Sequence, residues 1–170
     1  MDRLKAIKDR AEIMSVLLSK ATGYWSYIDK LLKYPLIISS SGLVIINSYF
    51  SDKQEDIKIY NLIFNSINIL FMAIINNLSL TSKIENYKAK SGEFYELSHE
   101  IDAEMMNNNH SNDKIVQLQQ KYDMIMKYTL QESIPDKIKN NIRNKFKGKK
   151  HLPLCLNGML NPELDNELQV

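Results

Sequence analysis

The chain has 170 residues, enough for one domain, and its 22 Lys and Arg residues nearly balance its 20 Asp and Glu residues. A net charge of +2 gives no electrostatic reason to expect nucleic acid as a partner. Cys155 is the only cysteine, which excludes an internal disulfide and a cysteine-rich zinc site. Glycine (5) and proline (4) are scarce, and the prolines lie where helices would start or stop, so we expect an all-α fold.

The first 33 residues predict an amphipathic helix. Its apolar residues recur at alternating spacings of three and four, which is typical of a coiled-coil seam. The seam consists of Leu4, Ile7, Ala11, Met14, Leu18, Ala21, Trp25, Ile28 and Leu32. Charges occur throughout this segment without an apolar core or a small-residue cleavage site, so we do not expect a secretory signal peptide.

Two stretches without a charged residue follow, at 34–51 and 59–82. They hold 18 and 24 residues, and as helices they would reach about 27 and about 36 Å, against a hydrocarbon core of about 30 Å. Aromatic residues lie near their ends, at headgroup depth: Tyr34, Tyr49, Phe50 and Tyr60. We therefore expect a two-helix transmembrane hairpin over 34–82. The alternative is a soluble helical bundle that buries both helices on all sides.

The distribution of lysines predicts the orientation of this hairpin. The connector 52–58 carries two lysines, whereas six flank the outer ends of the two spans. These six are Lys20, Lys30, Lys33, Lys83, Lys88 and Lys90. By the positive-inside tendency, we expect a multi-pass protein whose two termini are both cytoplasmic, with the lipid bilayer as its main partner.

A polar stripe runs along the second span. Its members are Asn61, Asn65, Asn68, Met72, Asn76 and Ser79, whose spacings of 4, 3, 4, 4 and 3 place them on one helix face. Carboxamides in hydrocarbon are costly unless paired, so this face must meet another helix or water. One interpretation is hydrogen bonding to small or polar residues of the first span, namely Ser39, Ser40, Ser41, Gly42 and Asn47. The other is that several hairpins assemble with the asparagines and Ser79 lining an aqueous path of poor ion selectivity.

Residues 83–132 predict a cytoplasmic pair of helices. The first keeps the heptad rhythm, with Ile84, Tyr87, Ser91, Phe94, Ser98, Ile101 and Met105 on its seam. The asparagine-rich segment 106–112 predicts a turn. A second amphipathic helix over about 113–131 then folds back, with Ile115, Leu118, Tyr122, Ile125 and Met126 on its apolar face. Such heptads pair within one chain or between copies, so we also expect a homo-oligomer.

Residues 133–170 predict a short basic helix and a tail. Pro135 lies early in this helix and Gly148 is expected to end it. Its cations are Lys137, Lys139, Arg143, Lys145, Lys147, Lys149 and Lys150. They form either a solvated face or a contact with anionic lipid headgroups. The apolar run 152–158 is expected to dock on the helices, ahead of an acidic tail.

Two weakly polar spans between a long helix and a helical pair resemble the SLATT family of prokaryotic two-transmembrane proteins, over about residues 4–130. Ile134-Pro135 with Ile138, Ile142 and Phe146, followed by the run 152–158, is similar to the tail of SLATT-like membrane proteins of large DNA viruses. The resemblance implies a membrane effector that forms pores on oligomerising, and it offers no catalytic residues. We expect no fused sensor or nuclease domain, so an activating signal would arrive through a partner.

No motif predicts an enzyme, a metal site or a cofactor. His99-Glu100 lacks the second histidine of a helical zinc protease. His110 and His151 have no metal-ligand spacing relative to Cys155, and no glycine-rich phosphate loop or serine nucleophile elbow occurs. Three hypotheses follow: an oligomeric pore-forming effector, a structural anchor or scaffold of a virion or organelle membrane, and a soluble interaction module.

Overall fold

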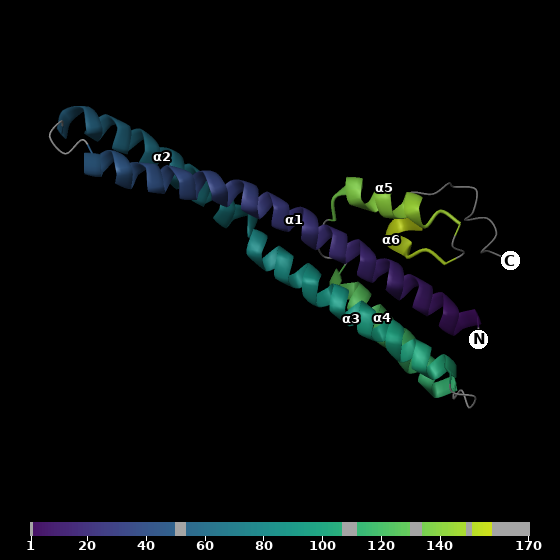
Figure 1. Cartoon of the computed structure of the whole chain (residues 1–170). Helices are drawn as coiled ribbons and strands as arrows, with labels where there is room; N and C mark the ends of the chain where they lie inside the picture. Colours follow the sequence, from purple (N-terminus) through teal and green to yellow (C-terminus); the bar gives the residue numbers. More distant parts are fainter. Residues whose placement is uncertain (1, 50–53, 107–111, 130–133, 149–150, 158–170) are drawn as a thin grey trace. The chain divides into compact units, whose positions relative to one another are not determined.

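The computed structural model describes residues 2–49, 54–106, 112–129, 134–148 and 151–157. Its regular structure is entirely helical, as the sequence predicted, and these ranges contain no strand. The helices are α1 (Asp2–Tyr49), α2 (Gln54–Leu78), α3 (Leu80–Met106), α4 (Asn112–Thr129), α5 (Asp136–Lys145) and α6 (Leu154–Asn157), as Figure 1 shows. They form two compact units: a bundle unit, Met1–Thr22 with Asn86–Val170, and a hairpin unit, Gly23–Glu85. The expected connector 52–58, turn 106–112 and acidic tail lie wholly or partly outside the described residues.

Helix α1 is continuous, and it contains both the amphipathic helix expected over 1–33 and most of the first expected span, 34–51. Pro35 lies inside it, so the expectation that prolines mark helix ends is wrong at this position. A proline removes one backbone N–H donor and crowds the carbonyl four residues earlier, at a cost of about 3 kcal/mol. The helix continues through Pro35 because each residue added to an existing helix forms one further backbone hydrogen bond. The helical residues before and after the ring together offset its cost.

The bundle unit has the core that the two heptad patterns predict. The part of the α1 seam that runs from Leu4 to Ala21 is fully buried, and so are Ile13 and Leu17, which the seam pattern leaves out. The buried residues of α3 and α4 in this unit are Tyr87, Phe94, Leu97, Ser98, Ile101, Leu118, Tyr122, Ile125, Met126 and Thr129. The rings of Phe94 and Tyr122 meet edge to face with centroids 5.8 Å apart, which joins α3 to α4.

The C-terminal segment also packs into the bundle unit. Helix α5 buries Ile138 and Ile142, and Leu152 and Leu156 of the following segment are buried as well. Pro135 caps the start of α5, whose last residue is Lys145, so Gly148 does not end the helix directly. Gly148 lies beyond it with φ +126°, a backbone conformation that glycine adopts without strain. Four of the apolar residues that carry the resemblance to viral tails, Ile138, Ile142, Leu152 and Leu156, are therefore part of the core.

The hairpin unit consists of the second half of α1 lying antiparallel to α2, with the start of α3 (Figure 1). Side-chain hydrogen bonds fix the register: Ser39 and Ser40 reach Asn68, and Asn47 reaches Asn61. Later residues of α1 thus meet earlier residues of α2. The side of α2 that is least exposed has its own heptad rhythm, made of Asn61, Phe64, Asn68, Phe71, Ile75 and Leu78.

A helix break interrupts the second predicted span. The sequence pattern predicts one helix through residues 59–82, but α2 ends at Leu78 and α3 begins at Leu80. Between them Ser79 has φ +46°, the left-handed region that a residue with a Cβ seldom adopts. Its hydroxyl and its backbone N–H both donate to the carbonyl of Asn76. These local bonds replace part of the helical ladder, as serine side chains do where helices end.

Candidate functional site

The outer surface of the hairpin unit is largely apolar. Ile38 is 72% exposed, Leu62 69% and Ile69 68%. Further exposed apolar residues of the unit are Ile37, Val44, Ile45, Ile63, Ile67, Leu70, Met72 and Ile74. Two helices of the structure are long and apolar enough to cross a membrane, and no residue in the apolar window of the first is buried inside the chain. An apolar surface of this extent is typical of a part of a protein that water does not contact.

The contact between the two helices of the hairpin unit carries polar groups. The Ser39 hydroxyl donates to the Asn68 side-chain oxygen, and the Asn68 amide lies 3.5 Å from the Ser40 hydroxyl. The Asn61 amide donates to the Asn47 side-chain oxygen over 2.9 Å. This hydrogen bonding is the first interpretation given to the polar stripe, and it accounts for Asn61 and Asn68.

The structure divides the predicted stripe rather than keeping its asparagines together. Asn61 and Asn68 are half-buried and face α1, whereas Asn65 and Asn76 are exposed. No hydrogen bond of the Asn65 or Asn76 side chain occurs among the described residues. Ser79 is exposed too, in the break between α2 and α3. The side-chain spacing found the right face, but it did not show that the contact with α1 occupies one flank of that face.

Charged and aromatic residues gather at the end of the hairpin unit that is opposite the connector. Lys83 lies 5.2 Å from the centre of the Trp25 ring, a cation–π contact between α3 and α1. Lys33 pairs with Asp29 over 2.7 Å, and Tyr24 packs edge to face on Trp25. Lysine and amphipathic aromatic rings together are the residues that lie at membrane–water interfaces. Among the four aromatic residues predicted to mark span ends, Tyr34 and Tyr60 are exposed, whereas the side chains of Tyr49 and Phe50 lie outside the described residues.

Ion pairs cover the outside of the bundle unit. Lys8 on α1 pairs with Asp102 on α3 over 2.5 Å, and this hydrogen bond raises the pKa of Lys8. Glu100 on α3 pairs with Lys121 on α4 over 2.6 Å, with Lys114 at 3.7 Å. The hydrogen bond from Lys121 lowers the pKa of Glu100. These pairs join neighbouring helices at their solvent-facing edges.

Two ionisable groups are held neutral inside the bundle unit. Burial raises the pKa of the Tyr122 hydroxyl and the pKa of the Cys155 thiol. The Cys155 sulfur lies 3.4 Å from the sulfur of Met14 on α1. Cys155 is half-buried, and its thiol packs against Met14.

The predicted basic helix is α5 together with the residues that follow it. Lys137, Lys145 and Lys147 are exposed, whereas Lys139 and Arg143 are half-buried. Lys139 pairs with Asp136 over 3.3 Å and Lys145 lies over the Phe146 ring at 5.6 Å. Lys149 and Lys150 lie outside the described residues. The solvated face and the headgroup contact both stay open as interpretations.

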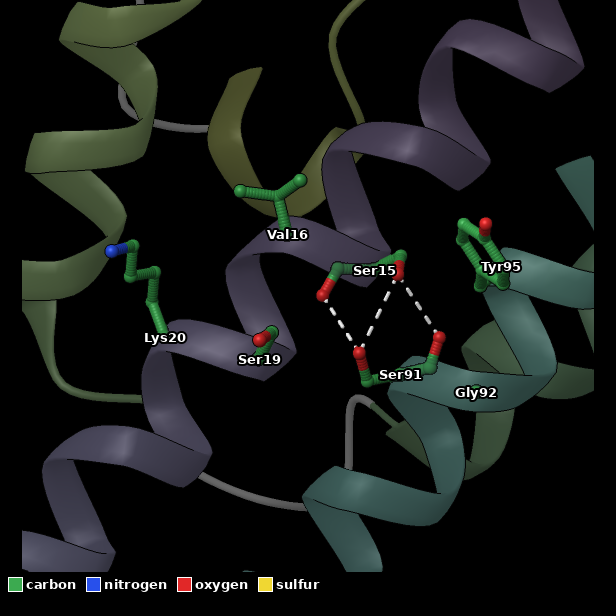
Figure 2. A pocket seen from close by; sticks show the side chains of 7 residues that line it. All are labelled: Ser15, Val16, Ser19, Lys20, Ser91, Gly92 and Tyr95. Carbon is green, nitrogen blue, oxygen red and sulfur yellow. Dashed lines mark hydrogen bonds between the residues drawn. The ribbon is translucent and has the colours of Figure 1, made fainter.

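A shallow groove of about 360 Å³ lies between α1 and α3 in the bundle unit (Figure 2). Ser15 and Ser91 close its floor by exchanging hydrogen bonds: each hydroxyl donates to the other residue's carbonyl, over 3.0 and 2.9 Å. Ser19 and Gly92 add small residues and Tyr95 forms one wall. These hydrogen bonds between Ser15 and Ser91 hold the two helices together.

The described ranges contain no group of three or more His, Cys, Asp or Glu residues placed to hold a metal ion. His99 is exposed and packs on the Tyr95 ring at 4.4 Å. The absence of catalytic residues, of a cofactor and of a nucleic-acid partner stays a prediction. No protein-family model, curated protein or solved structure matches this chain.

Proposed function

We propose that this chain is an integral membrane protein that crosses a bilayer twice, through the apolar parts of α1 and α2. The observation that carries the proposal is the inverted polarity of the hairpin unit: Ile38 and Leu62 are exposed, whereas Ser39 and Asn68 bond between the helices. Hydrocarbon favours such an arrangement, because lipid tails cover apolar side chains while polar groups pair between helices. In water, a soluble module would need other molecules to cover this surface.

The orientation follows from the lysines. The connector side carries Lys53 and Lys58, whereas the other end of the hairpin holds Lys33 and Lys83 beside Trp25. The positive-inside tendency then favours cytoplasmic termini, with the bundle unit in the cytoplasm.

Extraction at alkaline pH tests the membrane proposal. Vesicles that carry the chain are washed with carbonate, and the protein is expected to stay in the pellet. Protease added outside sealed, inside-out vesicles should cut in the asparagine-rich segment near residue 107 and leave the segment near residue 53 intact. Release by carbonate would refute spanning, and the opposite cleavage pattern would refute the orientation.

The function we assign to the assembled protein is that of a SLATT-like effector whose hairpins permeabilise a bilayer. The polar groups Asn65 and Asn76 support it, because exposed, uncharged carboxamides give the hairpin a polar side on which copies can assemble in a bilayer. Dye leakage from liposomes tests it. The wild-type chain should release dye, and a variant with Asn61, Asn65, Asn68 and Asn76 changed to leucine should not. Equal leakage from both would remove the pore.

A structural anchor is the second candidate, and a specific observation favours it. Asn61 and Asn68 use hydrogen bonds inside the hairpin, and the bundle unit is well packed with ion pairs on its surface. An anchor needs only these features. The leakage experiment separates the two candidates, because liposomes with an anchor retain dye as well as protein-free liposomes do.

A further inference from the structure

We infer that a second copy of this chain binds along one side of the hairpin unit, with Asn65 and Asn76 exchanging hydrogen bonds across the interface. This inference rests on the proposed membrane insertion. We call the surface the carboxamide face, and it consists of Ser40, Asn47, Asn65 and Asn76.

The four residues of the carboxamide face lie on the same side of the hairpin unit. At 3.6 residues per helical turn, Asn65 and Asn76 lie about 60° and about 80° around α2 from Asn68, in the same sense. Asn47 and Ser40 lie about 80° and about 100° around α1 from Ser39. Because the helices are antiparallel and Ser39 faces Asn68, these rotations point to the same side of the hairpin. The bonds from Asn47 to Asn61 and from Ser40 to Asn68 agree with that placement.

The exposed carboxamides of this face need hydrogen-bond partners. A carboxamide has two N–H donors and an accepting oxygen. Transfer of such a group to hydrocarbon without hydrogen-bond partners is strongly unfavourable. Asn65 and Asn76 are exposed and have no side-chain partner among the described residues. Lipid tails offer neither donors nor acceptors, so the occupant of this face must supply both.

A second copy of this chain offers the partners that the carboxamide face needs. The carboxamide face is uncharged, and each asparagine is its own complement because it donates and accepts. In a dimer with twofold symmetry the same patch of the two copies meets itself, so Asn65 and Asn76 of one copy face the asparagines of the other. The other side of the hairpin, which includes Ile63 and Leu70, is mainly apolar and lipid covers it equally well; its exposed polar residues are Ser66, which donates to the Leu62 carbonyl of its own helix, and Asn77. A second copy is the partner that this chemistry fits.

Thiol cross-linking in vesicles tests the interface directly. Cys155 is changed to alanine, and single variants N65C and N76C are compared with L70C in that background. Each of the first two variants leaves the other carboxamide in place. With a short bis-maleimide we expect N65C and N76C to give at least five times the covalent dimer of L70C. Equal yields at all three positions, or no dimer from N65C and N76C, would overturn the inference.

A second measurement separates this inference from the proposed function. The double variant N65L/N76L is expected to be monomeric in mild detergent, whereas the matched variant N61L/N68L keeps the assembly of the wild type. Both should resist carbonate washing. A wild type that stays in the membrane but is monomeric would sink the inference alone. Carbonate release of the wild type would sink both the inference and the spanning proposal.

Discussion

The bundle unit and the hairpin unit both contain part of α1, yet they distribute polarity in opposite ways. In the bundle unit Leu18 and Phe94 are inside, and Lys8 and Glu100 are near the solvent. In the hairpin unit Asn68 lies between the helices and Val44 is on the outside. Both units show the same three-four seam spacing. The comparison teaches that seam spacing identifies which side of a helix meets another helix, whereas the residues away from the seam indicate the surrounding medium.

The largest expected contrast comes from shortening a leucine in each unit. Leu97 is fully buried in the bundle unit, so Leu97→Ala leaves a cavity and should destabilise this unit by about 2–5 kcal/mol. Leu62 is exposed in the hairpin unit, and Leu62→Ala should leave the stability of the bundle unchanged. Hydrogen exchange of the α4 amides in detergent micelles measures both. Equal losses of protection would break the comparison.

A lysine substituted at an exposed position should have its larger effect in the hairpin unit, the reverse of the leucine substitutions. Val44 of the hairpin unit and Val116 of the bundle unit are both exposed. We expect Val44→Lys to oppose membrane insertion by about 2.5–3.5 kcal/mol, because the proposed surroundings of Val44 are lipid. Val116→Lys should have no effect on insertion, because water already solvates that position. Glycosylation mapping of the connector reports the inserted fraction. Efficient insertion of the Val44→Lys chain would contradict a lipid-facing surface.

Polar contacts between helices sharpen the comparison at a smaller scale. Ser39 and Asn68 share a hydrogen bond, so Ser39→Ala should cost about 0.6 kcal/mol, and Asn68→Ala should cost more because it also removes the contact with Ser40. Removing both should cost little more than Asn68→Ala alone. Ser15 and Ser91 each donate to the other's backbone carbonyl, so Ser15→Ala and Ser91→Ala should cost about 0.5–1.5 kcal/mol each and add. Unfolding in mixed micelles measures the four single and two double variants. Additive losses at Ser39 and Asn68 would show that these residues act separately.

The smallest effect concerns acid stability. The pKa of Glu100 is lower in the folded bundle than its ordinary value of 4.5, because Lys121 binds the charged form. The stabilisation is therefore present above that ordinary value and is lost as the pH falls through the lower folded value. Glu100→Gln should reduce the loss of unfolding free energy at acid pH by about 0.2–1 kcal/mol. The effect is small because the ion pair is partly exposed and screened by solvent.

Glu85→Gln in the hairpin unit serves as the control for that titration. Glu85 is exposed, and no ion pair of Glu85 occurs in the part of the chain that the structure describes. We expect unfolding curves between pH 6 and pH 3 to match the wild type in this variant. A change equal to that of Glu100→Gln would show that the acid response does not depend on the contact with Lys121.

Much of the bundle unit could be predicted from the sequence. Heptad spacing identified the buried faces of α1 and α3, and it also found Leu118 and Tyr122 on α4. The pattern left out Ile13 and Leu17 because a two-helix seam assumes one partner. In the bundle unit more than one element packs around α1, so the buried stripe is wider than a seam.

The hairpin unit was predicted less completely. The uncharged stretches identified the two apolar helices, but the break at Ser79 has no glycine or proline to announce it. The asparagine spacing led to one polar face, although the contact with α1 also includes Phe64 and Phe71. Aromatic side chains pack equally well against another helix or against lipid. The sequence therefore gave no reason to expect that the contact with α1 lies on the side of α2 that carries Phe64 and Phe71.

The proline inside α1 has a consequence for how deep that helix can lie. Pro35 has no N–H, so the carbonyl oxygen of Leu31 lacks its α-helical donor. In the proposed arrangement this oxygen lies just before the uncharged stretch that begins at Tyr34, at a level that water molecules reach. Sliding the helix one turn inward would carry the oxygen into hydrocarbon, where an unsatisfied backbone group costs several kcal/mol. In the proposed arrangement the Pro35 ring therefore limits how deeply α1 can lie in the bilayer.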